Sequence, residues 1–145
     1  MKILSMLIAF LLAAGLSASA SADPSCQLNL VGDKKVIQTI LSLHKGHLAS
    51  EEICDLLHDN GLSLSVTGQA SVSSGIAFGW ASVRLVDDAH LYSESFSSTT
   101  VTDKKKVSMA RANELMNLSF ESAVQDFRFL EATQQIKSYR AALKK

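Results

Sequence analysis

The side chains best suited to acid–base chemistry lie close together in one short stretch. A carboxylate near an imidazole can transfer protons or bind a metal ion, so such a stretch is where a reaction would be sought. The group consists of Arg84, Asp87, Asp88, His90, Tyr92 and Glu94. On a helix the two adjacent aspartates would point in different directions, and Asp88 and His90, two apart, would not share a face. The pattern favours a solvated helix face with ion pairs, and we take these residues as candidates for binding rather than catalysis.

No other motif in the sequence supplies catalytic chemistry. The chain has no Gly-x-Ser-x-Gly nucleophile elbow, no His-Glu-x-x-His zinc motif and no glycine loop that cradles phosphate. Cys54 and His58 stand four apart, but no second Cys/His pair of suitable spacing accompanies them. We therefore expect a protein that is not an enzyme and that has no metal site and no cofactor.

Two further features are candidate binding sites. Trp80 is the only tryptophan, and we interpret it as a core anchor, with an apolar pocket for a small ligand as the alternative. Lys104, Lys105 and Lys106 stand at the expected start of the last helix, where positive charge opposes the helix dipole. We interpret the three lysines as a solvated turn, with docking of an acidic partner as the alternative.

The first 22 residues resemble a cleavable export signal in their layout. Lys2 is followed by an apolar run over residues 3–16 and then by small residues at a cleavage site near Ala22. The run is shorter than the ~20 apolar residues that a spanning helix needs. We expect a periplasmic or secreted protein, a single domain over residues 23–145, and no stable membrane anchor after cleavage.

The predicted location gives the two cysteines a role. Cys26 and Cys54 form an even pair in an exported chain, and such pairs are typical of disulfides. A disulfide here would tie the N-terminal segment to a helix. The charges balance, with 14 Lys and Arg against 14 Asp and Glu, so no strong field predicts a nucleic-acid partner.

Helical spacing of apolar residues predicts most of the elements. Asp33 is expected to cap a helix over 33–45, and Ser50 a second one that stops at Asn60-Gly61. From 103 to 143 the spacing predicts one long helix. About 40 residues at ~1.5 Å each would be too long for a compact domain, so a bend is expected near Asn117 or where the apolar stripe shifts.

The segment from Leu62 to Ser98 can be interpreted with either period. Alternation of apolar and small residues favours a β-hairpin between Leu62 and Val86, which would make the fold α+β. We prefer a helix from near Gly68 to Phe96, because the alternation is lost after Val83 and the flanking segments are helical. The serine-rich stretch over 93–102 is then expected to be an exposed loop.

These expectations add up to an all-α protein, a bundle of about four helices around one core. The function expected for it is interaction with a protein of the cell envelope, as an inhibitor, a toxin-immunity factor or an accessory subunit of an envelope or secretion system. The alternative is a carrier of a small apolar ligand near Trp80.

Overall fold

The computed structural model describes residues 28–44 and 48–144, and the expected signal peptide lies outside them. The predicted all-α bundle is wrong, because the described residues form a four-stranded mixed sheet with helices packed on it. The elements in chain order are β1 (Leu30–Gly32), α1 (Lys34–Leu43), α2 (Glu51–Asp59), β2 (Leu62–Ser73), β3 (Ile76–Asp87), β4 (Tyr92–Asp103), α3 (Met109–Gln125) and α4 (Phe129–Ala142).

The strands lie in the order β1-β2-β3-β4. β1 pairs in parallel with β2, and the following strands form an antiparallel meander. Ser74 and Gly75 connect β2 to β3 with φ angles of 49° and 73°. Two successive positive φ angles give a two-residue turn whose twist matches that of the flanking strands. The hairpin between Leu62 and Val86 is therefore present, but it is the centre of a larger sheet.

The predicted helix from Gly68 to Phe96 is wrong, and side-chain size explains why. From Ala77 to Leu85 every second residue of β3 is buried, and most of these residues are small: Ala77, Gly79 and Ala81, followed by Val83 and Leu85. The residues between them include Phe78 and Trp80, so both faces of the strand carry apolar groups and the alternation is weak in a hydropathy pattern. The expected loop over 93–102 is part of β4.

Helix α3 lies almost directly on β3. A Cβ atom at Gly79 would collide with the backbone of Met116, and one at Gly68 would approach the Met116 Sδ atom to 3.5 Å. Ser119 Oγ donates a hydrogen bond of 2.8 Å to the Gly79 carbonyl. The small residues of β2 and β3 therefore line the face on which α3 packs, because they let the helix backbone approach the sheet.

The first two helices begin close to the predicted positions. The Asp33 side chain accepts hydrogen bonds from the amides of Lys35 and Val36 and caps α1. The Ser50 side chain caps α2 by accepting from the Ile53 amide. Each cap satisfies amides that the first helical turn would leave without a partner.

The predicted helix over 103–143 is two helices. Its first residues belong to β4 and to a turn, and α3 begins after its N-cap Ser108. The break between α3 and α4 falls at Asp126 to Arg128, where the apolar stripe changes face, rather than at Asn117. Lys104, Lys105 and Lys106 accordingly lie in an exposed turn before α3 and not in its first turn.

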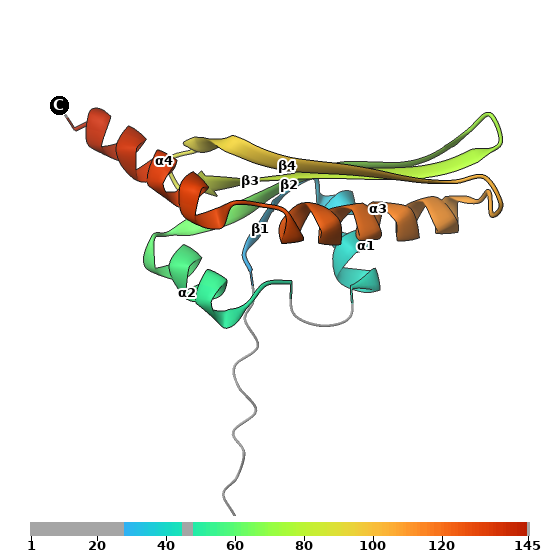
Figure 1. Cartoon of the computed structure of the whole chain (residues 1–145), viewed down its shortest axis with the longest axis horizontal. Coiled ribbons are helices and arrows are strands. Elements are labelled where there is room, and N and C mark those ends of the chain that lie inside the picture. Colours follow the sequence, from blue (N-terminus) through green and yellow to red (C-terminus); the bar gives the residue numbers. More distant parts are fainter. Residues whose placement is uncertain (1–27, 45–47, 145) are drawn as a thin grey trace, which may run out of the picture.

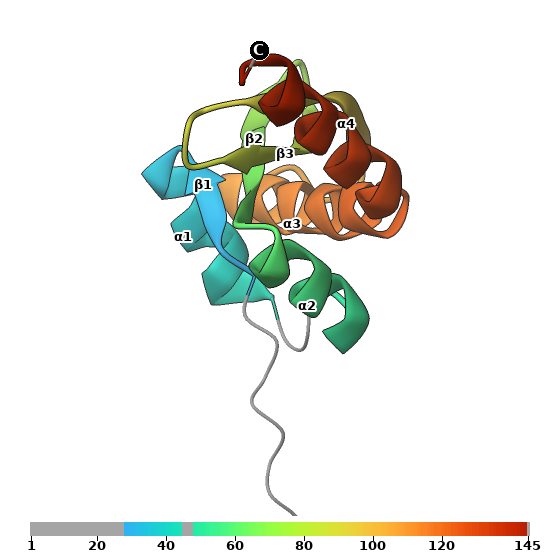
Figure 2. The same cartoon turned by 90° about the vertical axis from the view of Figure 1, so that its left-hand side faces the viewer.

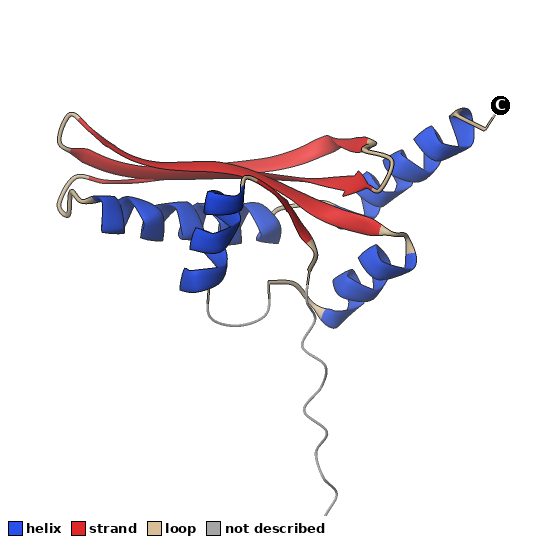
Figure 3. Cartoon of the chain, turned by 180° about the vertical axis from the view of Figure 1, so that it is seen from behind, coloured by secondary structure: helices blue, strands red, loops and turns tan. Residues whose placement is uncertain are grey.

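All four helices lie on one side of the sheet or beyond its end. Figures 1 and 3 show α1, α2 and α3 beneath the strands, while α4 leaves past one end. Figure 2 views the molecule from that end, with α4 above α3. The main core lies on this side, between β2, β3 and the helices, and includes Leu64, Val83, Phe120 and Ile136.

Candidate interaction surface

The opposite side of the sheet is not covered by any helix of the described residues over most of its length (Figures 1 and 3). Side chains alternate between the faces of a strand, so the neighbours of the core-facing residues point to this side. We call it the open face. It consists of Ser65, Thr67, Gln69 and Ser71 from β2, Phe78, Trp80, Ser82 and Arg84 from β3, and Tyr92, Glu94, Phe96, Ser98, Thr100 and Thr102 from β4.

Aromatic side chains give the open face its apolar character. Phe96 is 68% exposed, and Phe78 and Trp80 are half-buried on the neighbouring strand. The Arg84 guanidinium lies over the ring of Tyr92, 4.0 Å from its centroid. The attraction between a cation and the face of an aromatic ring restricts both side chains.

A hollow of about 240 Å³ opens among the polar residues of this face. Its lining consists of Ser65, Thr67, Ser82, Arg84, Ser93, Glu94 and Phe96. The Ser93 hydroxyl accepts a hydrogen bond from the Leu85 amide and donates one to the Ser95 carbonyl, so it is already engaged within the fold. The hollow therefore offers hydroxyl, guanidinium and carboxylate groups beside one exposed ring, a mixture that suits a polar group of a binding partner.

The open face is close to electrically neutral. Arg84 and Glu94 are its charged residues, and they lie in the same hollow. The Glu94 carboxylate also accepts a hydrogen bond from Tyr139 of α4, which raises the pKa of that phenol. A surface with one charge of each sign has no net positive potential, so this face does not attract a polyanion such as a nucleic acid.

The candidate residues from the sequence do not form one site. Trp80, Arg84 and Tyr92 lie together on the open face. Asp88 and His90 lie instead in the exposed turn between β3 and β4, where His90 has a φ of 60°.

Asp87 has a structural role. It is buried, and its Oδ1 atom accepts hydrogen bonds of 2.9 Å from the amides of Ala89 and Leu91. Its Oδ2 atom pairs with Arg140 Nε at 2.8 Å. Burial would raise the pKa of Asp87, but the Arg140 guanidinium and the two amides hold it below its ordinary value.

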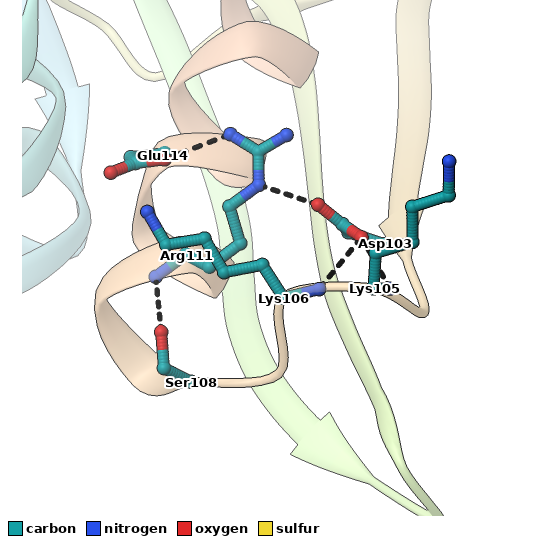
Figure 4. Close-up of polar contacts among 6 residues, drawn as sticks. All are labelled: Asp103, Lys105, Lys106, Ser108, Arg111 and Glu114. Carbon is teal, nitrogen blue, oxygen red and sulfur yellow. Dashed lines mark hydrogen bonds and ion pairs between the residues drawn. The ribbon is translucent and has the colours of Figure 1, made fainter.

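Lys105 and Lys106 belong to a separate polar cluster at the other end of β4 (Figure 4), and Lys104 precedes them in the same exposed turn. Asp103 Oδ1 accepts hydrogen bonds from the amides of Lys105 and Lys106, so the backbone of the turn, rather than the lysine side chains, holds the cluster together. Asp103 Oδ2 pairs with Arg111 Nε at 2.9 Å. The amides of Lys106 and Lys105 and then the Arg111 guanidinium lower the pKa of Asp103 to about 2. Arg111 also pairs with Glu114 at 2.8 Å and lowers its pKa.

Several residues of the open face were not predicted from the sequence. Phe78, Phe96 and the Ser and Thr residues that alternate with core residues along β4 reach the surface only because the segment is a strand. The available indication of a strand was that Phe96 stands between Ser95 and Ser97. The residues of β4 that alternate with Phe96 are mostly Ser and Thr, so no clear apolar–polar alternation could be detected.

Other expected features remain predictions. Cys26 lies outside the described residues, so its disulfide with Cys54 stays a prediction. Within residues 28–44 and 48–144, no group of three or more His, Cys, Asp or Glu side chains is placed to hold a metal ion. In the same ranges, no helix has the length and hydropathy needed to cross a membrane.

Comparison with known proteins leaves the family open. No protein-family model matches the chain, and no curated protein sequence matches it. Among solved structures it is similar to a minor lipoprotein from Acinetobacter baumannii, with 12% identity and a TM-score of 0.37 over 80% of this chain and 95% of the other. These values are too low to carry an argument about function, which must come from the residues of this chain.

Proposed function

We propose that the protein is an exported binding protein, without catalytic activity, that holds a protein of the cell envelope against its open face. The roles we expect are those of an inhibitor, a toxin-immunity factor or an accessory subunit of an envelope or secretion system. The observation that carries the proposal is a sheet face that the described helices leave uncovered over most of its length, with Phe96 68% exposed and Phe78, Trp80 and Tyr92 on the same face.

The composition of the face supports a protein as the partner. Aromatic residues and arginine are enriched in the centres of protein interfaces, whereas serine is depleted there, so Arg84 and the four aromatic rings of the face carry this argument. Tyr92 and Arg84 already form a stacked pair, so less side-chain freedom remains to be lost when a partner binds.

The size of the face also supports a protein partner. Strands of 12 residues at ~3.4 Å per residue span about 40 Å, and strand spacings of ~4.8 Å make three strands about 14 Å wide. This gives a flat area on the order of 600 Å², to which protruding side chains add further accessible surface. The value approaches the ~800 Å² that each partner of a standard interface buries.

The expected location supports a partner in the envelope. The proposal that the protein is periplasmic or secreted rests on the apolar run over residues 3–16 and the small residues that follow it. No observation favours the alternative of an apolar-ligand carrier, because Trp80 does not line the hollow on its own face and that hollow is mainly polar.

The proposal is tested by a substitution on the open face with a matched control on the helix side. Phe96→Ser removes the most exposed aromatic ring, while Leu41→Ser changes a residue of α1 that is 57% exposed away from this face. Each tagged protein is used to capture and quantify partners from an envelope extract by mass spectrometry. We expect Phe96→Ser to lose at least one protein that the wild type and Leu41→Ser both retain. Equal capture by all three would contradict the proposal.

A further inference from the structure

One edge of the sheet is partly covered by side chains of α4, and the other is paired over only part of its length. At β4, the Ser95 amide donates to Gln135 Oε1 at 3.0 Å, and the Ser95 hydroxyl donates to Glu131 Oε1 at 3.1 Å. Side chains of α4 therefore occupy part of that edge. At the opposite edge, β1 pairs with β2 only from Leu64 to Val66. No other described segment pairs with β2 from Thr67 to Ser73 on that side.

The direction of the free backbone groups follows from β1. The Leu64 amide donates to the Asn29 carbonyl at 2.9 Å, and the Val66 carbonyl lies against Gly32, so both groups point to the β1 side. Backbone groups of a strand alternate in direction along its length, so the N–H and C=O groups of Gly68, Ala70 and Val72 point the same way. The hairpin end of β2 extends past α1, and none of the elements drawn in Figures 1 and 3 pairs with it on this side.

A hollow of about 350 Å³ runs beside this free edge. It is lined by Asp33, Lys35, Val36 and Thr39 from α1, Gly68, Gln69 and Ala70 from β2, and Asn113 and Met116 from α3. The hollow lies where β1 would continue if the chain did not turn into α1 at Asp33. A strand placed there would direct alternate side chains toward Val36 and Met116.

The free edge has none of the residues that usually protect one. Natural edge strands carry lysine, proline or other charged residues that discourage pairing. The stretch from Thr67 to Ser73 has no charge and no proline, and its small residues leave room beside the backbone. An alternating row of N–H and C=O groups is matched by another extended backbone and not by a helix or a small molecule.

We propose that the edge of β2 from Thr67 to Ser73 is a β-augmentation site, which binds an extended segment of the partner protein as an additional strand. The inference rests on the proposed function, because it takes the partner to be a protein. We expect the bound segment of the partner to have an apolar residue at every second position, facing Val36 and Met116 in the hollow. Charged residues are not needed for this binding.

The test uses a phage-displayed library of random twelve-residue peptides, selected on the protein as recovered from cells that express the full sequence. The most enriched peptide is synthesised, and amide hydrogen exchange is followed by NMR with and without it. We expect the amides of Gly68, Ala70 and Val72 to exchange rapidly in the free protein and to become protected when the peptide binds.

Two variants locate the peptide. Ala70→Pro removes an outward N–H without removing a bond to β3, and Thr39→Trp fills the hollow from α1 without changing β2. Each should weaken peptide binding by about tenfold or more, whereas Phe96→Ser should not change it. Circular dichroism checks that each variant is folded. If Ala70→Pro does not fold, peptide binding to Thr39→Trp and the hydrogen exchange of the three amides together test the location of the peptide.

Three results would overturn the inference. They are the absence of any enriched peptide, a peptide that leaves the three amides unprotected, and a dimer by light scattering in which these amides are already protected without peptide. Partner capture that is lost in Phe96→Ser but retained in both edge variants would leave the proposed function in place and overturn the edge site alone.

Discussion

Asp87 connects three parts of the molecule through a single carboxylate. One oxygen accepts from the amides of the β3–β4 turn, and the other pairs with Arg140 of α4. Arg140 in turn donates to the Asn60 carbonyl at the end of α2 at 2.8 Å. The side chain of Asp87 is 3% exposed, so its charge depends on these partners rather than on water.

Replacing Arg140 tests this role. In Arg140→Leu the Asp87 carboxylate stays buried without its cation, and breaking a buried pair typically costs about 3 to 5 kcal/mol. Because the Arg140 side chain is 34% exposed, we expect a smaller loss of about 2 to 3 kcal/mol in the free energy of unfolding, measured by urea denaturation at pH 7. The matched control is Arg128→Leu, at a residue 80% exposed and paired with Glu131, which should change the value by under about 0.5 kcal/mol. Equal effects would refute the structural role.

Asp103 predicts how stability depends on acid. Its pKa is lowered from 3.8 to about 2 in the folded protein, so folding favours the ionised form. The resulting stabilisation is present above about pH 4 and is lost as the pH falls from about 4 to about 2. We expect the urea midpoint of the wild type to decrease over this window and that of Asp103→Asn to decrease less. A wild type and variant with parallel pH profiles would show that Asp103 does not contribute.

The individual roles of polar residues were the hardest to predict from the sequence. Asp87 and Arg140 are 53 positions apart, so their pairing depends on α4 crossing the end of β3. Asp103 and Arg111 are only 8 apart, but the sequence pattern placed both in one helix, in which Asp103 would not receive the amides of the turn. Trp80, Arg84 and Tyr92 were predicted as binding candidates, and they do lie on one surface.

At the scale of elements, the contact between α3 and β3 determines how the sheet is covered. Gly79→Ala places a Cβ against the Met116 backbone, which cannot move without shifting the helix. We expect a loss of about 1 to 3 kcal/mol in the free energy of unfolding, as for other overpacked cores. Ser82→Thr adds one carbon to the open face of the same strand and should change stability by under about 0.5 kcal/mol. A Gly79→Ala variant as stable as the wild type would mean that α3 does not approach this closely.

The elements that could be predicted are those whose local signals agree with the tertiary structure. Capping residues Asp33 and Ser50 begin α1 and α2 as expected, because each cap acts within one turn. In β3 the apolar pattern was compatible with both a strand and a helix. The close packing of α3 requires small residues on one face of the strand, while the open face carries Phe78 and Trp80. β4 has mainly Ser and Thr, which gave no apolar pattern to detect.

At the scale of the whole molecule, the fold has two unlike sides. One side of the sheet carries the helices and the core, and the other presents aromatic and hydroxyl groups (Figure 1). The expected export of the protein can be tested by the intact mass of the recovered chain. We expect a chain that begins at Asp23 and is two hydrogens lighter than its reduced form, as the Cys26–Cys54 disulfide requires. A chain that retains residues 1–22, or that is unchanged in mass by reduction, would contradict these predictions.

The open face, and not the helix side, is the surface that we propose contacts a protein partner. The sharpest measurement places a photo-crosslinking amino acid at position 96 on the open face or at position 41 on α1, in cells that produce the protein. We predict that light produces a specific crosslinked protein from position 96 and none of that mass from position 41. Crosslinks from position 41 alone, or the absence of any crosslink from position 96, would contradict the proposed role of the open face.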